Sequence, residues 1–304
     1  MSVTAQAVKE LREKSGAGML DCKNALVETN GNISEAMDLL RKKGMATADK
    51  KAGRTAAEGL IAIATASDNK SAAAIELNSE TDFVAKNAEF QAAAENIANI
   101  ALAKSDGNIE NVKPAECNTQ KIPVSEIVTN LVAKIGENIQ LRRTVKLSSP
   151  NGVVTTYLHN KATDNTGKIG VLVALEGADE AKLQEVGKQI AMHIAAAKPE
   201  ALTRAEVPNE NLDKEREIFT AQAKAEGKPD NIIEKMVEGR INKYYGEIVL
   251  PEQVFVIDGK AKVQDFLKAN GDIKITGFEL FILGDGIEKK QEDFAAEVAA
   301  VAKG

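Results

Sequence analysis

Apolar and polar positions change their period several times along the chain, and each period predicts an element. Through residues 1–44, apolar residues recur three or four positions apart, with short glycine-containing breaks between the runs. This spacing predicts three short helices, because side chains three or four apart share one helix face. Asn32 and Glu35 have the spacing of a capping box for the third helix, and Gly44 is expected to end it. A unit this small buries little surface, which is typical of an interaction module.

Two stretches in the middle of the chain share the order strand, polar turn, strand, helix. Apolar runs at 59–65 and 72–77 flank the first polar turn, and runs at 152–158 and 170–175 flank the second. A helical segment rich in isoleucine and alanine follows each pair of runs. The repetition predicts an α+β core made of two related strand-strand-helix subdomains.

Residues 209–245 have a different pattern, in which apolar residues three, four or seven apart lie among many charges. A Gly-Lys-Pro break at 227–229 divides the stretch, which predicts an antiparallel coiled-coil hairpin with one apolar seam. Such a hairpin either closes on itself or projects for docking or assembly, including a homodimer, and the sequence leaves these alternatives open. A strand at 273–283 and an amphipathic helix at 288–303 are predicted to follow.

Shifts in composition divide the predicted α+β chain into five parts. Residues 45–58, which are rich in alanine, lysine and glycine, are expected to form a linker that is at most partly helical. The parts are the three-helix module with its linker (1–54), the first core subdomain (55–144), the second core subdomain (145–205 and 246–284), the inserted hairpin (206–245) and a C-terminal helix module (285–304).

Length and charge restrict the function classes. The 304 residues suffice for about two domains, and the net charge of −6 argues against nucleic acid as a direct ligand, because phosphate binding needs a concentrated positive face. The two cysteines lie far apart and do not suggest a disulfide framework. No apolar run approaches a membrane span, and the N-terminus lacks the apolar core of a signal peptide. We therefore expect a cytoplasmic protein that does not bind membranes.

The inventory of catalytic residues is small. There are two histidines, and no phosphate loop, HExxH or CxxC pattern occurs. His193 lies within an apolar helix, which favours a core or interface histidine over a catalytic base. The Leu-Gly-Asp-Gly turn at 283–286 lacks the third glycine of a dinucleotide loop and has no βαβ unit after it. We expect no cofactor, no metal and no covalent catalysis.

A turn between a predicted strand and a predicted helix is the strongest candidate site. Thr81 or Ser79 is expected to cap the helix, and Asp82 would favour the positive end of the helix dipole. Phe83, in this position, is a candidate anchor for another protein. Its separation of seven residues from Phe90 is equally typical of a helical core, so spacing alone does not decide between exposure and burial.

Met19 and Leu20, at the start of the second helix, present a similar choice. Met19 has the helical spacing of a core stripe with Cys22 and Leu26. A small interaction module can instead expose such residues on the face that meets a partner. The pattern leaves both interpretations open.

Two segments carry a resemblance to a known family. Residues 11–26, LREKSGAGMLDCKNAL, and 76–86, ELNSETDFVAK, closely resemble the two characteristic segments of the bacterial elongation factor Ts family. The resemblance continues in the same order over essentially the whole chain, through 132–138, 190–199, 235–240 and 294–300. Departures are minor: Ser15 where the family often has Thr, Leu20 where Met is frequent, and Ser79 where Cys sometimes occurs.

This resemblance implies a fold and a function. The implied fold is a ubiquitin-associated-like module, a core of two related subdomains, a coiled-coil hairpin and a C-terminal helix. The implied function is that of an exchange factor that binds elongation factor Tu and promotes the release of GDP and Mg²⁺, so that GTP can bind. An adaptor that binds a partner through the module and hairpin, without altering nucleotide turnover, remains the alternative.

The resemblance also assigns residues. It implies that the segment Thr81, Asp82, Phe83 and Val84 reaches the partner's Mg²⁺ region, with Phe83 as a wedge, Asp82 perturbing the polar network around the metal and Thr81 shaping the turn. Met19 and Leu20 would dock the first module on the partner. The subdomain that contains His193 would contact another domain of the partner, and His193 carries this role only weakly.

Overall fold

The N-terminal unit consists of three helices, as predicted. The computed structural model describes residues 3–118 and 121–288, so the predicted helix at 288–303 lies outside the described residues. Helices α1 (Ala5–Ser15), α2 (Met19–Glu28) and α3 (Ile33–Lys51) pack around a small apolar core. The Asn32 side chain accepts hydrogen bonds from the N–H groups of Ser34 and Glu35, and its amide donates to the Glu35 carboxylate at 2.7 Å. The predicted capping box is therefore confirmed.

The expectation that Gly44 ends the third helix is wrong. Helix α3 continues through Gly44 to Lys51 and lies against α7 (Val124–Ile135). A Cβ at Gly44 would be 3.4 Å from Thr129 Cγ2, an ordinary contact distance, so Gly44 lies within the packed face between two helices and not at a helix end. The predicted linker at 45–58 is correspondingly short, because only residues 52–57 join α3 to the first strand.

Polar contacts also attach the N-terminal unit to α7. The Arg41 side chain forms an ion pair with Glu126 at 3.4 Å, and the Asn130 amide donates to the Ser15 carbonyl at 3.1 Å. The unit and the body are thus in direct contact along α3 and α7.

Two antiparallel sheets form the body, so the chain has a mixed α/β fold. The predicted strand pairs at 59–77 and 152–175 are confirmed as β1–β2 and β4–β6. The first sheet has the order β3 (Gln140–Ser148), β2 (Ser71–Ser79), β1 (Glu58–Thr65), β5 (Thr166–Gly167), and the second has the order β4 (Val153–His159), β6 (Ile169–Glu176), β7 (Lys274–Ile282).

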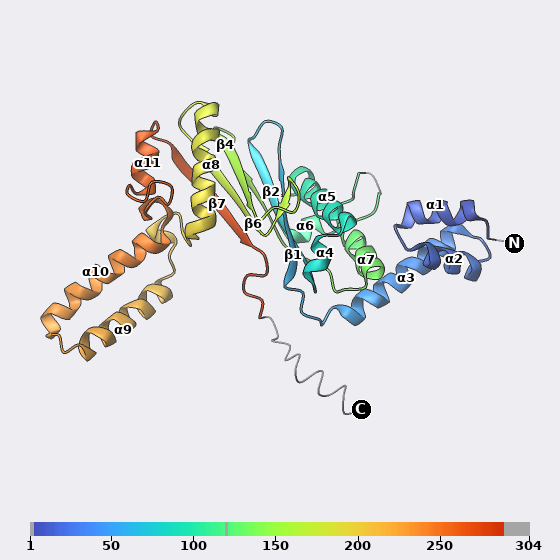
Figure 1. Ribbon diagram of the computed structural model, residues 1–304, viewed down its shortest axis with the longest axis horizontal. Coiled ribbons are helices and arrows are strands. Elements are labelled where there is room, and N and C mark those ends of the chain that lie inside the picture. The colour runs from blue at the N-terminus through green and yellow to red at the C-terminus, as the bar shows by residue number, and fades with distance from the viewer. Residues whose placement is uncertain (1–2, 119–120, 289–304) are drawn as a thin grey trace.

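The two sheets pack between two long helices (Figure 1). On β1, Leu60 and Ala62 face α5 (Ala88–Lys104), whereas Ile61 and Ile63 face the second sheet. On β6, Val171, Val173 and Leu175 face α8 (Glu180–Ala197). Strands β1 and β6 are therefore buried on both sides, which explains why they are continuous apolar runs in the sequence.

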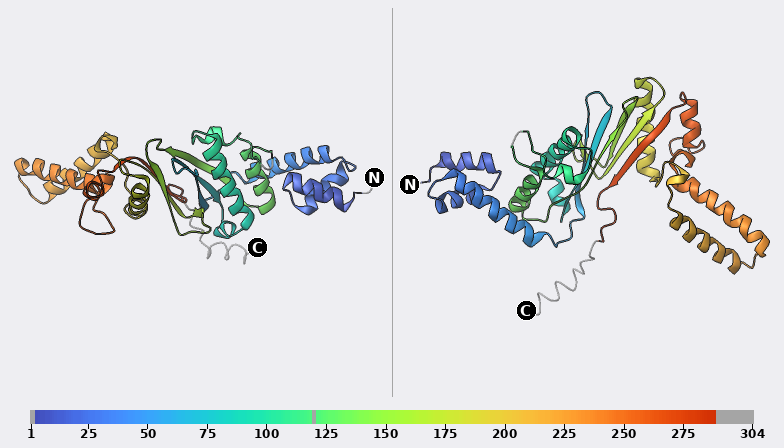
Figure 2. Two further views of the ribbon diagram at one scale, coloured as in Figure 1. Left: turned by 90° about the horizontal axis from the view of Figure 1, so that it is seen from above. Right: turned by 180° about the vertical axis from the view of Figure 1, so that it is seen from behind.

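A helical hairpin projects from the body, at the end opposite the N-terminal unit (Figures 1 and 2). Its helices are α9 (Asn209–Ala225) and α10 (Asp230–Ile248), and its seam lies between them. At its base, the Arg204 guanidinium binds both Glu252 carboxylate oxygens, at 2.5 and 2.7 Å, and lies 4.4 Å from the Tyr245 ring. The seam residues are Phe219, Ala223, Ile233, Val237, Ile241 and Tyr245.

The remaining helices are short. They are α4 (Asp82–Ala85), α6 (Ile109–Val112) and α11 (Val263–Ala269), with 3-10 turns at Arg204–Glu206 and Leu250–Glu252. Within the described residues, no helix is both long and apolar enough to cross a membrane.

Replacing Gly187 by alanine is expected to destabilise the body, because α8 lies very close to the second sheet at this residue. A Cβ here would lie 2.8 Å from both Thr155 Cβ and Leu175 Cδ1. Such overpacking costs about 1–3 kcal/mol, against about 1 kcal/mol that alanine adds to helix stability. Urea denaturation measures the change. Gly239 is the control, because it is exposed on α10 and a Cβ added there would meet no other part of the molecule within 4 Å. Equal changes in the free energy of unfolding for Gly187→Ala and Gly239→Ala would contradict the prediction.

Candidate functional site

The turn after β2 carries an exposed phenylalanine, whereas the helix that follows carries a buried one. Helix α4 is a single turn whose last residues, Val84 and Ala85, are buried in the core beneath α5. Phe90, on α5, is fully buried, whereas 75% of Phe83 is exposed. Asp82 and Phe83 therefore face solvent on a turn whose next two residues are anchored in the core.

The expected capping role of Thr81 is wrong. Thr81 occupies the N-cap position of α4, but neither its side chain nor that of Ser79 makes a capping bond to this helix. The Thr81 hydroxyl instead donates to Glu137 at 2.6 Å, and the Ser79 hydroxyl donates to the Thr81 carbonyl at 2.9 Å. Helix α5 has its own cap, the Asn87 side chain.

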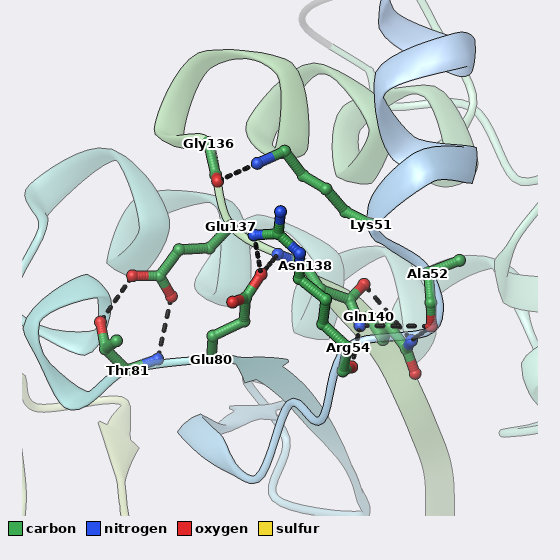
Figure 3. A network of polar contacts seen from close by, with 9 residues as sticks. All are labelled: Lys51, Ala52, Arg54, Glu80, Thr81, Gly136, Glu137, Asn138 and Gln140. Carbon is green, nitrogen blue, oxygen red and sulfur yellow. Dashed lines mark hydrogen bonds and ion pairs between the residues drawn. The ribbon is translucent and has the colours of Figure 1, made fainter. Parts of the chain in front are cut away.

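The connection between α7 and β3 holds this turn (Figure 3). The Glu137 carboxylate accepts from both Thr81 groups, the N–H at 2.9 Å and the hydroxyl at 2.6 Å. The neighbouring Glu80 carboxylate accepts from the Asn138 N–H at 2.5 Å and from Arg54 at 3.4 Å. Both acids receive charge-assisted hydrogen bonds, which are among the stronger ones in proteins.

The same connection holds the end of α3 (Figure 3). The Asn138 amide donates to the Arg54 carbonyl at 2.6 Å, and the Gln140 amide donates to the Ala52 carbonyl at 3.3 Å. The Lys51 ammonium donates to the Gly136 carbonyl. Residues 136–140 thus contact both the Phe83 turn and the C-terminal end of the N-terminal unit.

The exposed charges beside Phe83 are weakly held. The Asp82 carboxylate pairs with Lys86 at 3.3 Å, and the Lys86 ammonium lies 5.4 Å from the centre of the Phe83 ring. More than half of each side chain in the ion pair is exposed, so the pair contributes little to stability and is easily replaced by another contact.

A buried carboxylate, that of Glu76, lies on β2, the strand that leads into the turn. Glu76 is fully buried and accepts from Arg143 at 2.6 Å, Asn78 at 3.0 Å and the Gly284 N–H at 2.9 Å, with Arg142 at 3.2 Å. Burial by itself raises the pKa of the Glu76 carboxyl. The hydrogen bonds from Gly284, Asn78 and Arg143, with the charge of Arg143, nevertheless bring that pKa below its ordinary value of 4.5.

The glycine-containing turn at 283–286 belongs to this cluster. Gly284 has φ 71°, and a Cβ there would collide with the Ala57 carbonyl oxygen. Arg142 and Arg143 donate to the carbonyls of Asp285 and Ile282, at 2.6 and 2.9 Å. Gly284 therefore has a structural explanation. Glu76, in contrast, was missed in the sequence, where its only local signal is an acid within an apolar strand.

Met19 and Leu20 lie on the surface of the N-terminal unit. Met19 is 61% exposed and Leu20 is 69% exposed, while Cys22 and Leu26 form the core beneath them. The core stripe of α2 thus excludes Met19, and both residues are accessible to another molecule.

His193, on α8, is fully buried, as its apolar surroundings predicted. Its Nδ1 accepts from the Val256 N–H at 3.2 Å, so Nε2 carries the proton that is donated to Gln253 Oε1 at 2.9 Å. Burial lowers the pKa of the imidazole, and the hydrogen bond to Gln253 acts in the opposite direction. The side chain has no exposed surface, so any contribution of His193 to docking is indirect, through the segment that it holds.

The described residues contain no group of three or more histidine, cysteine or acidic side chains that could hold a metal ion. The sites that the structure does present are an exposed phenylalanine on an anchored turn and exposed apolar residues on a small helical unit. Such features suit contact with another macromolecule.

The anchored turn lies at the start of the part of the chain that matches a known family. The family model described as Elongation factor TS matches residues 80–285. The chain is 52% identical over 306 residues to Elongation factor Ts of Rhodospirillum centenum, which covers 99% of both chains. It is 54% identical over 308 residues to that of Rhodospirillum rubrum, again 99% of both, and 55% identical over 310 residues to that of Brucella ovis, the whole of both.

This chain has a mixed α/β fold and matches these relatives over its whole length, so it is a translation elongation factor. The chain belongs to the Elongation factor Ts family.

Proposed function

We propose that this chain is a guanine-nucleotide exchange factor, which binds elongation factor Tu and promotes the release of GDP and Mg²⁺ so that GTP can bind. The observation that carries the proposal is Phe83, a large apolar side chain that is 75% exposed on a turn anchored on both sides. Exposed aromatic side chains on rigid supports are typical anchors of protein interfaces. Family membership supports the proposal, since its relatives bear the name Elongation factor Ts.

The energetics of exchange define what the turn has to do. A G protein that holds GDP at nanomolar affinity is bound by about 12 kcal/mol, so spontaneous release is slow. A factor accelerates release by replacing part of that binding free energy with its own contacts. By linkage, a factor that weakens GDP binding is itself bound more weakly by the same ratio when GDP is present. A transient ternary complex then resolves in either direction, with no covalent step.

Each residue of the turn has a part in this proposal. Phe83 inserts into an apolar crevice of the G domain and displaces the elements that position the Mg²⁺ ligands. Asp82, exposed beside it, perturbs the polar network around the metal by charge or hydrogen bonding. Thr81 and Val84 fix the turn, through Glu137 and through the core respectively.

Docking in this proposal uses a second surface. Met19 and Leu20 supply affinity by packing on a G-domain helix, and the projecting hairpin is available for docking or assembly. The proposal includes a cytoplasmic location and no direct contact with nucleic acid or membranes, in line with the net charge of −6.

Release of mant-GDP from elongation factor Tu tests the proposal. The chain is expected to accelerate fluorescence loss catalytically, at concentrations well below that of the G protein. Stable binding in a pull-down without any acceleration would contradict exchange activity and favour the adaptor alternative.

Substitution of Met19 and Leu20 by serine is expected to weaken binding about thirtyfold, since apolar anchors of an interface contribute about 1 kcal/mol or more each and about 1.4 kcal/mol is a factor of ten in affinity. Titration calorimetry with nucleotide-free elongation factor Tu measures the change. Point substitutions are preferable to deletion of the unit, because deletion would uncover α7. Met45→Ser, at a 52% exposed apolar position on α3, is the matched control, and equal weakening by this control would contradict specific docking.

A further inference from the structure

The direction of Phe83 is fixed by its neighbours and not by packing of its own ring. Phe83 is 75% exposed, and within the described residues its ring makes one cation–π contact, with the Lys86 ammonium 5.4 Å from the ring centre. Helix α4 has four residues and no side-chain cap, so it cannot orient the ring by itself. What orients Phe83 is the anchoring of the backbone before and after it.

The two anchors have different chemistry. After Phe83, Val84 and Ala85 are 5% and 4% exposed in the core of the first sheet. Before it, Thr81 gives both its N–H and its hydroxyl to one carboxylate, that of Glu137. Glu137 comes from a separate part of the chain, 56 residues further along. This bond pair is the polar anchor of the turn (Figure 3).

Glu137 is itself well placed to be rigid. It follows Gly136, which ends α7 in a left-handed conformation (φ 85°), and precedes Asn138, which is 3% exposed. The Asn138 N–H and amide are both bonded, to Glu80 at 2.5 Å and to the Arg54 carbonyl at 2.6 Å. The carboxylate that holds Thr81 is therefore supported by a buried, hydrogen-bonded neighbour.

We propose that Glu137 is a positioning residue for nucleotide exchange, which holds Thr81 so that Phe83 enters the partner in one orientation. This inference rests on the proposed function. It assigns Glu137 no contact with nucleotide or metal. When a functional side chain is held loosely, the rate of release falls more than the affinity for the partner, because misplacement affects the step that depends on precise geometry.

The test measures mant-GDP release from elongation factor Tu over a range of factor concentrations. Glu137→Ala is expected to lower the maximal release rate about tenfold, with little change in the half-saturating concentration. Glu137→Gln is expected to stay within about threefold of wild type, because its carbonyl accepts the Thr81 N–H and its amide donates to the Thr81 hydroxyl. Glu95→Ala is the matched control: the Glu95 carboxylate accepts from the Thr163 hydroxyl at 2.6 Å but holds a different loop, and its rate should equal that of wild type.

Two further readouts separate positioning from other roles. Amide hydrogen exchange at Thr81 should become at least about tenfold faster in Glu137→Ala while the melting temperature stays near that of wild type. Thr81→Val, which removes only the hydroxyl bond, should lower the rate in the wild-type background and change nothing further in the Glu137→Ala background. Multiplicative losses in the double variant would mean that Glu137 acts independently of Thr81, and would overturn the inference.

The possible failures are distinguishable. No acceleration by the wild-type chain would overturn the proposed function itself. If the wild-type chain accelerates release, Phe83→Ala strongly lowers that acceleration, and both Glu137→Ala and Thr81→Val match wild type, only the positioning role of Glu137 is overturned.

Discussion

Phe83→Ala is expected to lower stimulated GDP release by about thirtyfold or more, while the fold remains intact. Interface anchors of this kind are worth about 2 kcal/mol or more, and a difference of about 1.4 kcal/mol is a factor of ten in rate. Because 75% of the side chain is exposed in the free protein, its truncation should change the free energy of unfolding by less than about 0.5 kcal/mol. The mant-GDP assay, with circular dichroism melting alongside, measures both quantities.

Phe90 provides a matched control for this experiment. It is the same residue type on the next helix, but it is fully buried, so Phe90→Ala should cost about 3–5 kcal/mol of stability. The pair separates loss of a contact with the partner from loss of the fold. If Phe83→Ala unfolds the protein as Phe90→Ala does, or leaves exchange unchanged, Phe83 is not the wedge.

Glu76→Gln is expected to destabilise the protein by about 3 kcal/mol at pH 7, because it leaves Arg142 and Arg143 without their charged partner. Both arginines keep roughly a third of their side chains exposed, so solvent offsets part of the loss and the value should lie at the low end for buried pairs. Urea denaturation followed by circular dichroism measures the difference between the two proteins.

The difference in the free energy of unfolding between wild type and Glu76→Gln should also depend on pH, and the pKa shift fixes the direction of that dependence. The pKa of the Glu76 carboxyl is lowered in the folded protein, because its hydrogen bonds and the Arg143 charge outweigh the effect of burial. Its contribution is therefore complete above the ordinary value of 4.5 and is lost as the pH falls below that value. The gap between wild type and Glu76→Gln should narrow from pH 5 to about pH 3, and a gap independent of pH would contradict this assignment. Glu252, whose pKa the Arg204 hydrogen bond lowers, titrates in both proteins and does not affect the comparison.

The paired strands were predictable because they are buried on both faces. Such strands have no polar face, and their residues form uninterrupted apolar runs between polar turns, as at 59–65 and 72–77. The helical hairpin was predictable for a related reason, since its seam repeats at a helical period. These features depend on residues close in sequence.

Features that depend on distant contacts could not be predicted. Gly44 resembles a helix stop, and only the side chains of α7, far along the chain, show that it lies in a helix–helix contact instead. The separation of Phe83 and Phe90 was ambiguous because it implies a shared face only within one helix, whereas α4 ends at Ala85 and α5 begins at Ala88. Glu137 looks like an ordinary surface acid, and Glu76 is an unexplained acid within an apolar strand, until their partners, up to 208 residues away, are known.

The continuity of α3 affects how the two proposed docking surfaces act together. If residues 45–58 were a flexible linker, the distance between its ends would fluctuate around about 20 Å. The N-terminal unit would then have to dock in a separate step after Phe83 had bound. In the structure, α3 extends without a break from the N-terminal unit along α7 to the residues that contact 136–140. If Met19 and Leu20 dock the partner as proposed, their binding presents Phe83 at a single geometry and at a high effective concentration. A partner whose two sites match that geometry gains avidity, and one whose sites do not match it is excluded.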